Sequence, residues 1–168
     1  GERHRVLMLP GSDGRAEGAL VGLGNLDDLK ALNLWHAAPL AERLPPGIWR
    51  VATPLPGEAA TQFALGWLTG AYRFSRYRSA PGAGHSMLAA PEGADVGYAR
   101  AAAGAMARAR DLVNTPANDL GPAELARAAT ELAHLHGAGI DVIEGDALAA
   151  GYPMIHAVGR ASARAPRL

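Results

Sequence analysis

The chain has 168 residues, which is enough for one ordinary domain or for a small domain followed by part of another. Hydrophobic residues make up 49% and charged residues 19%, a balance that excludes an intrinsically disordered chain. Sixteen basic and sixteen acidic residues cancel, so no net field favours nucleic acid or an anionic membrane. The sequence contains no cysteine, which excludes disulfides and thiolate chemistry and fits a cytoplasmic location, and no apolar run reaches the roughly 20 residues of a membrane helix.

The first half of the chain predicts short strands that alternate with helices. Apolar runs separated by Gly, Pro and Asp mark the strands, and apolar residues three or four positions apart mark the helices. In chain order we expect strands at 6–9 and 19–23 that form a hairpin, a helix at 26–43, a strand at 48–52, a helix at 58–74, an exposed loop at 79–84 and a strand at 86–90.

The second half begins with a helix at 95–113, and another follows after a short polar turn. Gly121 suits the N-cap of this next helix, Pro122 its first position and Glu124 its first turn. Its predicted buried stripe consists of Leu125, Ala128, Ala129, Leu132 and Leu135. A strand at 139–143, a short helix at 144–150 and a strand at 155–158 complete an α/β pattern.

The segment between these two long helices carries a family resemblance. It reads Arg-Asp-Leu-Val-Asn-Thr-Pro-Ala-Asn over 110–118, and Pro122 opens the helix that follows. The segment resembles the leucyl aminopeptidase (cytosol aminopeptidase) family of metallopeptidases, with further agreement at 64–74 and 156–168. The residues that we single out are Arg110, Asn114, Pro116 and Asn118, for which we expect a structural role in an interdomain turn.

The resemblance implies a domain organisation as well as an activity. It implies a small macro-like N-terminal α/β domain at 1–94, with a mixed sheet flanked by helices, then a linker helix at 95–113. Residues 114–168 would be the opening segment of an α/β catalytic domain. Family members remove N-terminal residues from peptides, are known as hexamers, and hold two divalent metal ions, manganese or zinc, through clustered carboxylates and a Lys.

The elements that bind these metals in the family, Lys-Gly-x-x-Phe-Asp and Asn-Thr-Asp-Ala-Glu-Gly-Arg, do not occur in this sequence. We therefore assign no catalytic, cofactor-binding or metal-binding residue to it. The expectation is a fragment of a longer enzyme, inactive alone, that serves packing, regulation or assembly.

Other candidate sites have simpler interpretations. His134 and His136 lie two positions apart on a helix and do not share a face, and Ser162 has no nucleophile elbow around it. The loop at 22–25 could hold a phosphate but carries only two glycines of the dinucleotide pattern, which favours a tight turn. Two alternatives remain open: a macro-like module that binds ADP-ribose through this loop, and a standalone interaction protein without a catalytic half.

Overall fold

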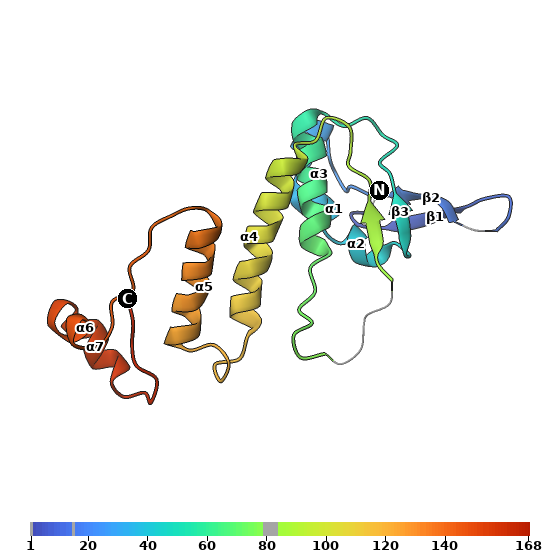
Figure 1. The fold of residues 1–168 in the computed structure, drawn as a ribbon. Helices are drawn as coiled ribbons and strands as arrows, with labels where there is room; N and C mark the ends of the chain where they lie inside the picture. Colours follow the sequence, from blue (N-terminus) through green and yellow to red (C-terminus); the bar gives the residue numbers. More distant parts are fainter. Residues whose placement is uncertain (1, 15, 79–83) are drawn as a thin grey trace. The chain divides into compact units, whose positions relative to one another are not determined.

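The computed structural model describes residues 2–14, 16–78 and 84–168, and its backbone separates into two compact units, 1–109 and 110–168. The first unit holds four short strands and most of the helices, and the second holds three helices (Figure 1). Among the described residues, no helix is long and apolar enough to cross a bilayer. The exposed loop predicted at 79–84 lies, apart from Gly84, outside the described residues.

The predicted hairpin is confirmed as β1 (Val6–Pro10) and β2 (Ala16–Val21), which pair antiparallel. Val6 lies opposite Val21 and Leu7 opposite Leu20, and the register shifts between Leu9 and Pro10. The predicted strands at 48–52 and 86–90 are present in shorter form as β3 (Gly47–Trp49) and β4 (Ser86–Leu88), which pair parallel. The single mixed sheet that we expected is not formed, because the four strands make two separate two-stranded sheets.

The long helix expected at 26–43 is wrong. The chain forms a 3-10 turn, η1 (Leu29–Ala31), and two single-turn helices, α1 (Leu34–Ala37) and α2 (Leu40–Arg43). The Asn33 side chain accepts the N–H of Trp35 at 3.1 Å, which caps a new helix start, and Pro39 takes the N-cap of α2. The apolar residues of this segment recur at helical spacing, but the N-caps at Asn33 and Pro39 divide the segment into separate short helices.

Helix α3 (Gly57–Gly70) is the centre of the first unit and packs beside α1. Its Gly66 and Gly70 allow this packing, since a Cβ at either position would lie 2.1 Å from the Leu34 carbonyl oxygen or 1.7 Å from that of Ala38. Two aromatic side chains of this helix, Phe63 and Trp67, are buried. The main core cluster comprises Leu32, Ala37, Leu40, Leu44, Ala59, Phe63 and Trp67, with Val6, Met8, Ala19 and Val21 of the hairpin packed against it.

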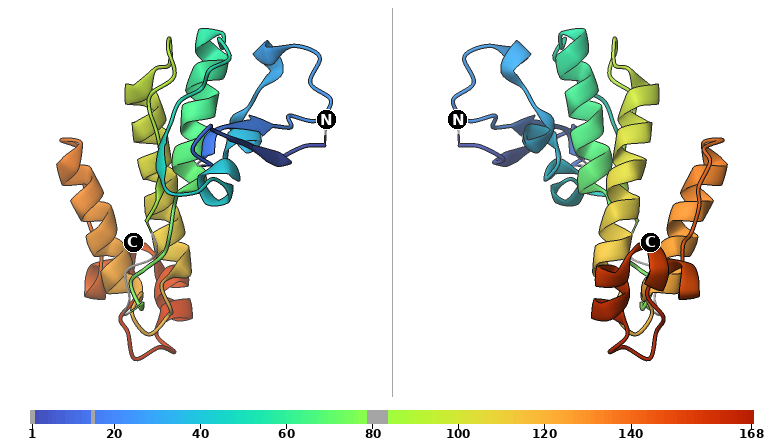
Figure 2. Two further views of the ribbon diagram at one scale, coloured as in Figure 1. Left: turned by 90° about the vertical axis from the view of Figure 1, so that its right-hand side faces the viewer. Right: turned by 90° about the vertical axis from the view of Figure 1, so that its left-hand side faces the viewer.

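Helix α4 (Val96–Asn114) confirms the helix predicted at 95–113. Its start is fixed by Asp95, whose Oδ1 accepts the N–H of Tyr98 at 2.9 Å. In the first unit Ala99 is buried in a second cluster with Ala64 and Leu65 of α3, and both views in Figure 2 show the first half of α4 alongside α3.

The second unit contains α5 (Pro122–Leu135), α6 (Gly145–Gly151) and α7 (Pro153–Gly159). Helices α5 and α6 match the predictions in position. The strand predicted at 155–158 is wrong, because Pro153 stands at the first position of a helix that contains those residues. The strand predicted at 139–143 is also wrong, although Ile143 exchanges two backbone hydrogen bonds with Leu168, of 2.8 and 2.9 Å.

Candidate functional site

The motif at 110–118 forms the end of α4 and a compact turn after it. Asn114 is the last residue of the helix, and the hydroxyl of buried Thr115 donates back to the Asp111 carbonyl at 2.7 Å. The Pro116 carbonyl then accepts the N–H groups of Asp119 at 2.9 Å and Leu120 at 3.0 Å. The hydroxyl bond adds to the Thr115 N–H, which the same Asp111 carbonyl accepts at 3.0 Å, and the Pro116 carbonyl closes the turn that follows. The local sequence thus ends α4 and forms a compact turn before α5.

The start of α5 adopts the predicted capping arrangement. Gly121 is the N-cap, Pro122 follows at the first position, and the Gly121 N–H donates to Oε2 of Glu124 at 2.9 Å. This hydrogen bond is the main cause that holds the pKa of the Glu124 carboxyl below its ordinary value. The backbone N–H of Glu124 itself and then the charges of Arg164 and Arg127 act in the same direction, while partial loss of water opposes them.

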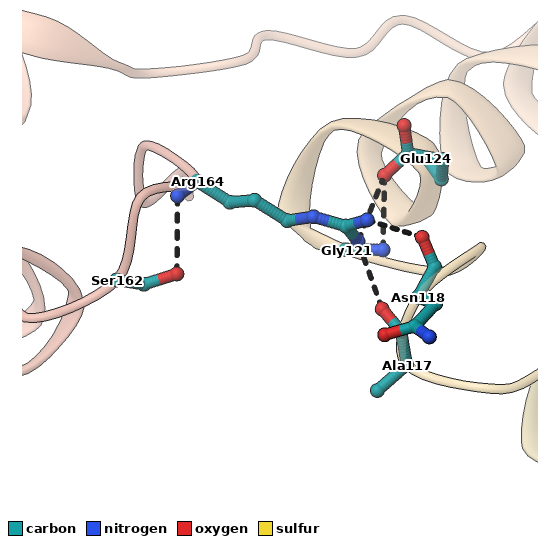
Figure 3. Close-up of polar contacts among 6 residues, drawn as sticks. All are labelled: Ala117, Asn118, Gly121, Glu124, Ser162 and Arg164. Atoms are coloured by element: carbon teal, nitrogen blue, oxygen red, sulfur yellow. Dashed lines mark hydrogen bonds and ion pairs between the residues drawn. The ribbon is translucent and has the colours of Figure 1, made fainter.

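Arg164 joins this turn to the far end of the second unit. Its Nη1 donates to the Ala117 carbonyl at 2.8 Å and lies 3.9 Å from Oε2 of Glu124, and its Nη2 donates to the Asn118 carbonyl (Figure 3). The Arg164 backbone N–H in turn donates to Oγ of Ser162 at 3.1 Å. We call these residues the Arg164 cluster: Ala117, Asn118, Gly121, Glu124, Ser162 and Arg164.

Glycine at position 121 leaves room for this close approach. A Cβ built there would lie 2.5 Å from Nη1 and 2.7 Å from Cδ of Arg164. Its φ of −107° is open to any residue, so space and not backbone conformation restricts the position. The arginine side chain thus occupies the space that a side chain at residue 121 would take, and such a side chain would require Arg164 to move.

A second contact holds the end of the chain near the start of α6. Nη1 of Arg167 pairs with Oε2 of Glu144 at 3.0 Å, and the same two residues form an antiparallel bridge. Together with the Ile143–Leu168 hydrogen bonds, this pair fixes residues 167 and 168 against 143 and 144.

The structure distributes the four predicted motif residues unevenly. Arg110 and Asn114 lie in the last two turns of α4, and Pro116 contributes its carbonyl to the turn. Asn118 meets Arg164 through its main-chain carbonyl. Sequence reasoning did not single out Arg164 or predict that Glu124 would meet it, and no spacing rule links positions 46 or 47 residues apart.

The groups in the Arg164 cluster serve to hold parts of the chain in place. Carbonyl oxygens, a capping carboxylate and a guanidinium hold two chain segments together, and the Ser162 hydroxyl accepts a backbone hydrogen bond. Over residues 2–14, 16–78 and 84–168, no group of three or more His, Cys, Asp or Glu side chains is placed to hold a metal ion.

The loop at 22–25 is engaged in the fold of the first unit. The Gly22 N–H donates to the Arg5 carbonyl at 2.8 Å, and the Gly22 carbonyl accepts the N–H of His4 at 2.7 Å. A Cβ at Gly22 would lie 2.0 Å from the carbonyl oxygen of Glu2, which accounts for this glycine by close packing.

Comparison with protein families assigns both halves of the chain to one class. Residues 1–90 match the model of the M17 aminopeptidase N-terminal domain, and residues 107–168 match that of the cytosol aminopeptidase family catalytic domain. These two matches place the chain in the class of aminopeptidase-related proteins. The chain belongs to the M17, or cytosol, aminopeptidase family, as its sequence motif indicated.

Individual relatives agree with this assignment. The probable cytosol aminopeptidase of Nocardia farcinica is 40% identical over 161 residues, covering 88% of this chain and 32% of that protein. That of Leifsonia xyli subsp. xyli is 35% identical over 181 residues, covering all of this chain and 36% of the relative. The chain therefore spans about a third of the length of the curated relatives that it matches.

Solved structures give the same result for the fold. The cytosol aminopeptidase of Coxiella burnetii matches with a TM-score of 0.82 and 29% identity, over 99% of this chain and 35% of that one. The bottromycin maturation enzyme BotP, in complex with Mn, matches with a TM-score of 0.78 and 36% identity, over 99% of this chain and 38% of that one.

Proposed function

We propose that this chain is the amino-terminal part of a metal-dependent aminopeptidase that removes N-terminal residues from peptides in the cytoplasm. The observation that carries the proposal is that one chain matches both an M17 N-terminal domain and the start of the catalytic domain while covering about a third of its relatives. The alternative, a standalone macro-like binding module, is less favoured because these relatives are named as aminopeptidases.

The residues that the structure describes do not fit a two-metal centre. Such a centre needs several carboxylates at one point, and the described residues offer no group of three or more potential ligands. We place the two divalent ions, manganese or zinc, in a remaining part of the catalytic domain. The complex of BotP with Mn supports manganese as the first ion to test. The 168-residue chain alone is expected to be inactive.

If the metal ions lie outside this chain, its three parts would have the following roles. Residues 1–94 would form a macro-like domain that serves packing, regulation or subunit assembly, and residues 95–113 would link it to the catalytic segment at 114–168. We propose that the longer enzyme is a homo-oligomer, a hexamer by family resemblance, without a membrane or nucleic-acid partner.

We further propose a structural role for Arg110, Asn114, Pro116 and Asn118 in joining the two domains. Support comes from the turn itself, in which Pro116 and Asn118 contribute the carbonyls that Asp119, Leu120 and Arg164 bind. The substitution Asn118→Ala in the longer enzyme tests what the Asn118 side chain adds to this role, because the main-chain carbonyl that binds Arg164 remains. Unchanged thermal stability together with abolished activity would contradict it and favour direct substrate contact.

An aminopeptidase assay tests the proposed function. The 168-residue chain and the longer protein from its source cells are each given leucine p-nitroanilide with added Mn²⁺, and a chelator serves as the control. We expect chelator-sensitive release of nitroaniline from the longer protein and none from the short chain. Metal-dependent hydrolysis by the short chain at a comparable rate, or an inactive longer protein, would overturn the proposal.

A further inference from the structure

Helix α5 presents its large apolar side chains to solvent. The stripe that the sequence predicts as buried contains Leu125, Leu132 and Leu135, which are 53%, 40% and 66% exposed. The half-buried residues of the same helix are mostly small and include Ala126, Ala128, Thr130 and Ala133. The larger apolar side chains of the helix are thus more exposed than its smaller ones.

This arrangement is unfavourable for a free surface. Full burial of a leucine side chain provides roughly 1.5–3 kcal/mol, and each of these partly exposed leucines loses a share of it. The second unit cannot supply a cover from its own core, because Leu148 is the one apolar side chain that is buried in residues 110–168. Met154 and Val158, four positions apart on α7, are exposed as well. A segment of this size, residues 110–168, buries only about 60% of the surface that its unfolded chain exposes even in a favourable case.

Two of the exposed leucines of α5, Leu125 and Leu132, lie apart from the ion pair on the same helix. The charged side chains Arg127 and Glu131 lie on another side of the helix, where they form an i,i+4 ion pair of 4.0 Å. At about 100° per residue, Leu125, Ala129 and Leu132 share one line that contains no charged residue. A partner could therefore cover Leu125 and Leu132 without removing a charge from water, whereas Leu135 lies next to Glu131, four positions before it.

We propose that the exposed leucine face of α5 is the docking surface for the remaining part of an M17 catalytic domain. This inference rests on the proposed function. Two observations identify the occupant. Residues 107–168 match the catalytic-domain family, and the chain accounts for only 32% of the Nocardia farcinica relative, so most of a catalytic domain lies outside it. A second copy of the chain is the less suitable occupant, because three leucines on one helix provide far less than the roughly 800 Å² per partner of a stable interface.

Thiol labelling tests the proposal, because the chain has no cysteine of its own. Leu125→Cys is introduced both into the 168-residue chain and into the longer protein expressed in the source cells. Arg127→Cys, on the charged side of the same helix, is the matched control, and Leu132→Cys is the second variant if the first fails to fold. The rate of alkylation at each position is measured by peptide mass spectrometry.

We expect Leu125→Cys and Arg127→Cys to be alkylated at similar rates in the short chain. In the longer protein, Leu125→Cys is expected to be alkylated at least about tenfold more slowly, because docking would leave its thiol accessible only during local opening. Equal rates in a longer protein that retains aminopeptidase activity would overturn the docking surface and leave the proposed function intact. Slow alkylation of Leu125→Cys in the short chain would also overturn the docking surface. A rate that depends on protein concentration would indicate that a second copy covers the residue. A rate that does not would indicate that the first unit covers it. A native protein of only 17.3 kDa would end both proposals.

Discussion

The guanidinium of Arg164 donates a 2.8 Å hydrogen bond to the carbonyl of Ala117, a residue 47 positions earlier in the chain. This bond and the one to Asn118 join the two ends of the second unit. Few apolar side chains are buried in that unit, so polar contacts of this kind carry much of its order.

Substitution of this arginine should destabilise the second unit. Arg164→Ala removes two hydrogen bonds donated by a charged group, and we expect a loss of about 1–3 kcal/mol, reduced by its partial exposure. Arg127→Ala is the control, since its exposed ion pair contributes only about 0–0.5 kcal/mol. Amide exchange over α5 is the suitable measurement. Exchange that is equally fast in both variants would show that the Arg164 contacts contribute nothing.

The lowered pKa of Glu124 predicts a pH dependence with a definite sign. A carboxyl whose folded pKa lies below its unfolded value of about 4.3 stabilises the folded state above that pH. The contribution is lost as the pH falls through the folded pKa. We expect Glu124→Gln to be less stable than the wild type at pH 6 and to approach it at pH 3. A stability difference that stays constant between these values would contradict the assignment.

Close packing in the first unit makes a separate prediction. Gly66→Ala on α3 would place a Cβ 2.1 Å from the Leu34 carbonyl oxygen, so we expect a loss of about 1–3 kcal/mol or more. Gly104→Ala on α4 meets no atom within 4 Å and should stabilise by about 0.5–1 kcal/mol. All three tryptophans lie in the first unit, so urea unfolding followed by their fluorescence measures both changes. Equal effects of the two substitutions would exclude the α1–α3 contact as the cause.

The sequence predicted those parts of the fold that local chemistry decides. The N-cap at Gly121, the end of α4 near Asn114 and the β1–β2 hairpin all follow from residues within a few positions of each other. The helix expected at 26–43 was wrong because the periodicity of its leucines hid two helix starts, at Asn33 and Pro39. The strand expected at 155–158 was wrong because the short segment Ile-His-Ala-Val fits either structure, and Pro153 before it begins a helix.

The candidate site was predicted only in part, for a different reason. The turn at 110–122 could be located from its motif, since its residues are consecutive. Its partner Arg164 could not, because a contact between distant positions depends on the path of the whole second unit. The exposed stripe of α5 was likewise read as buried, since periodicity shows which residues share a face and not what covers that face.

The intact mass of the native protein, captured from its source cells with an antibody raised against this chain, tests the central claim most directly. The account predicts a mass well above 17.3 kDa, roughly three times that value, since the matched part covers 32% of the Nocardia farcinica relative. A native mass near 17.3 kDa would contradict the account and would make the macro-like binding module the leading explanation.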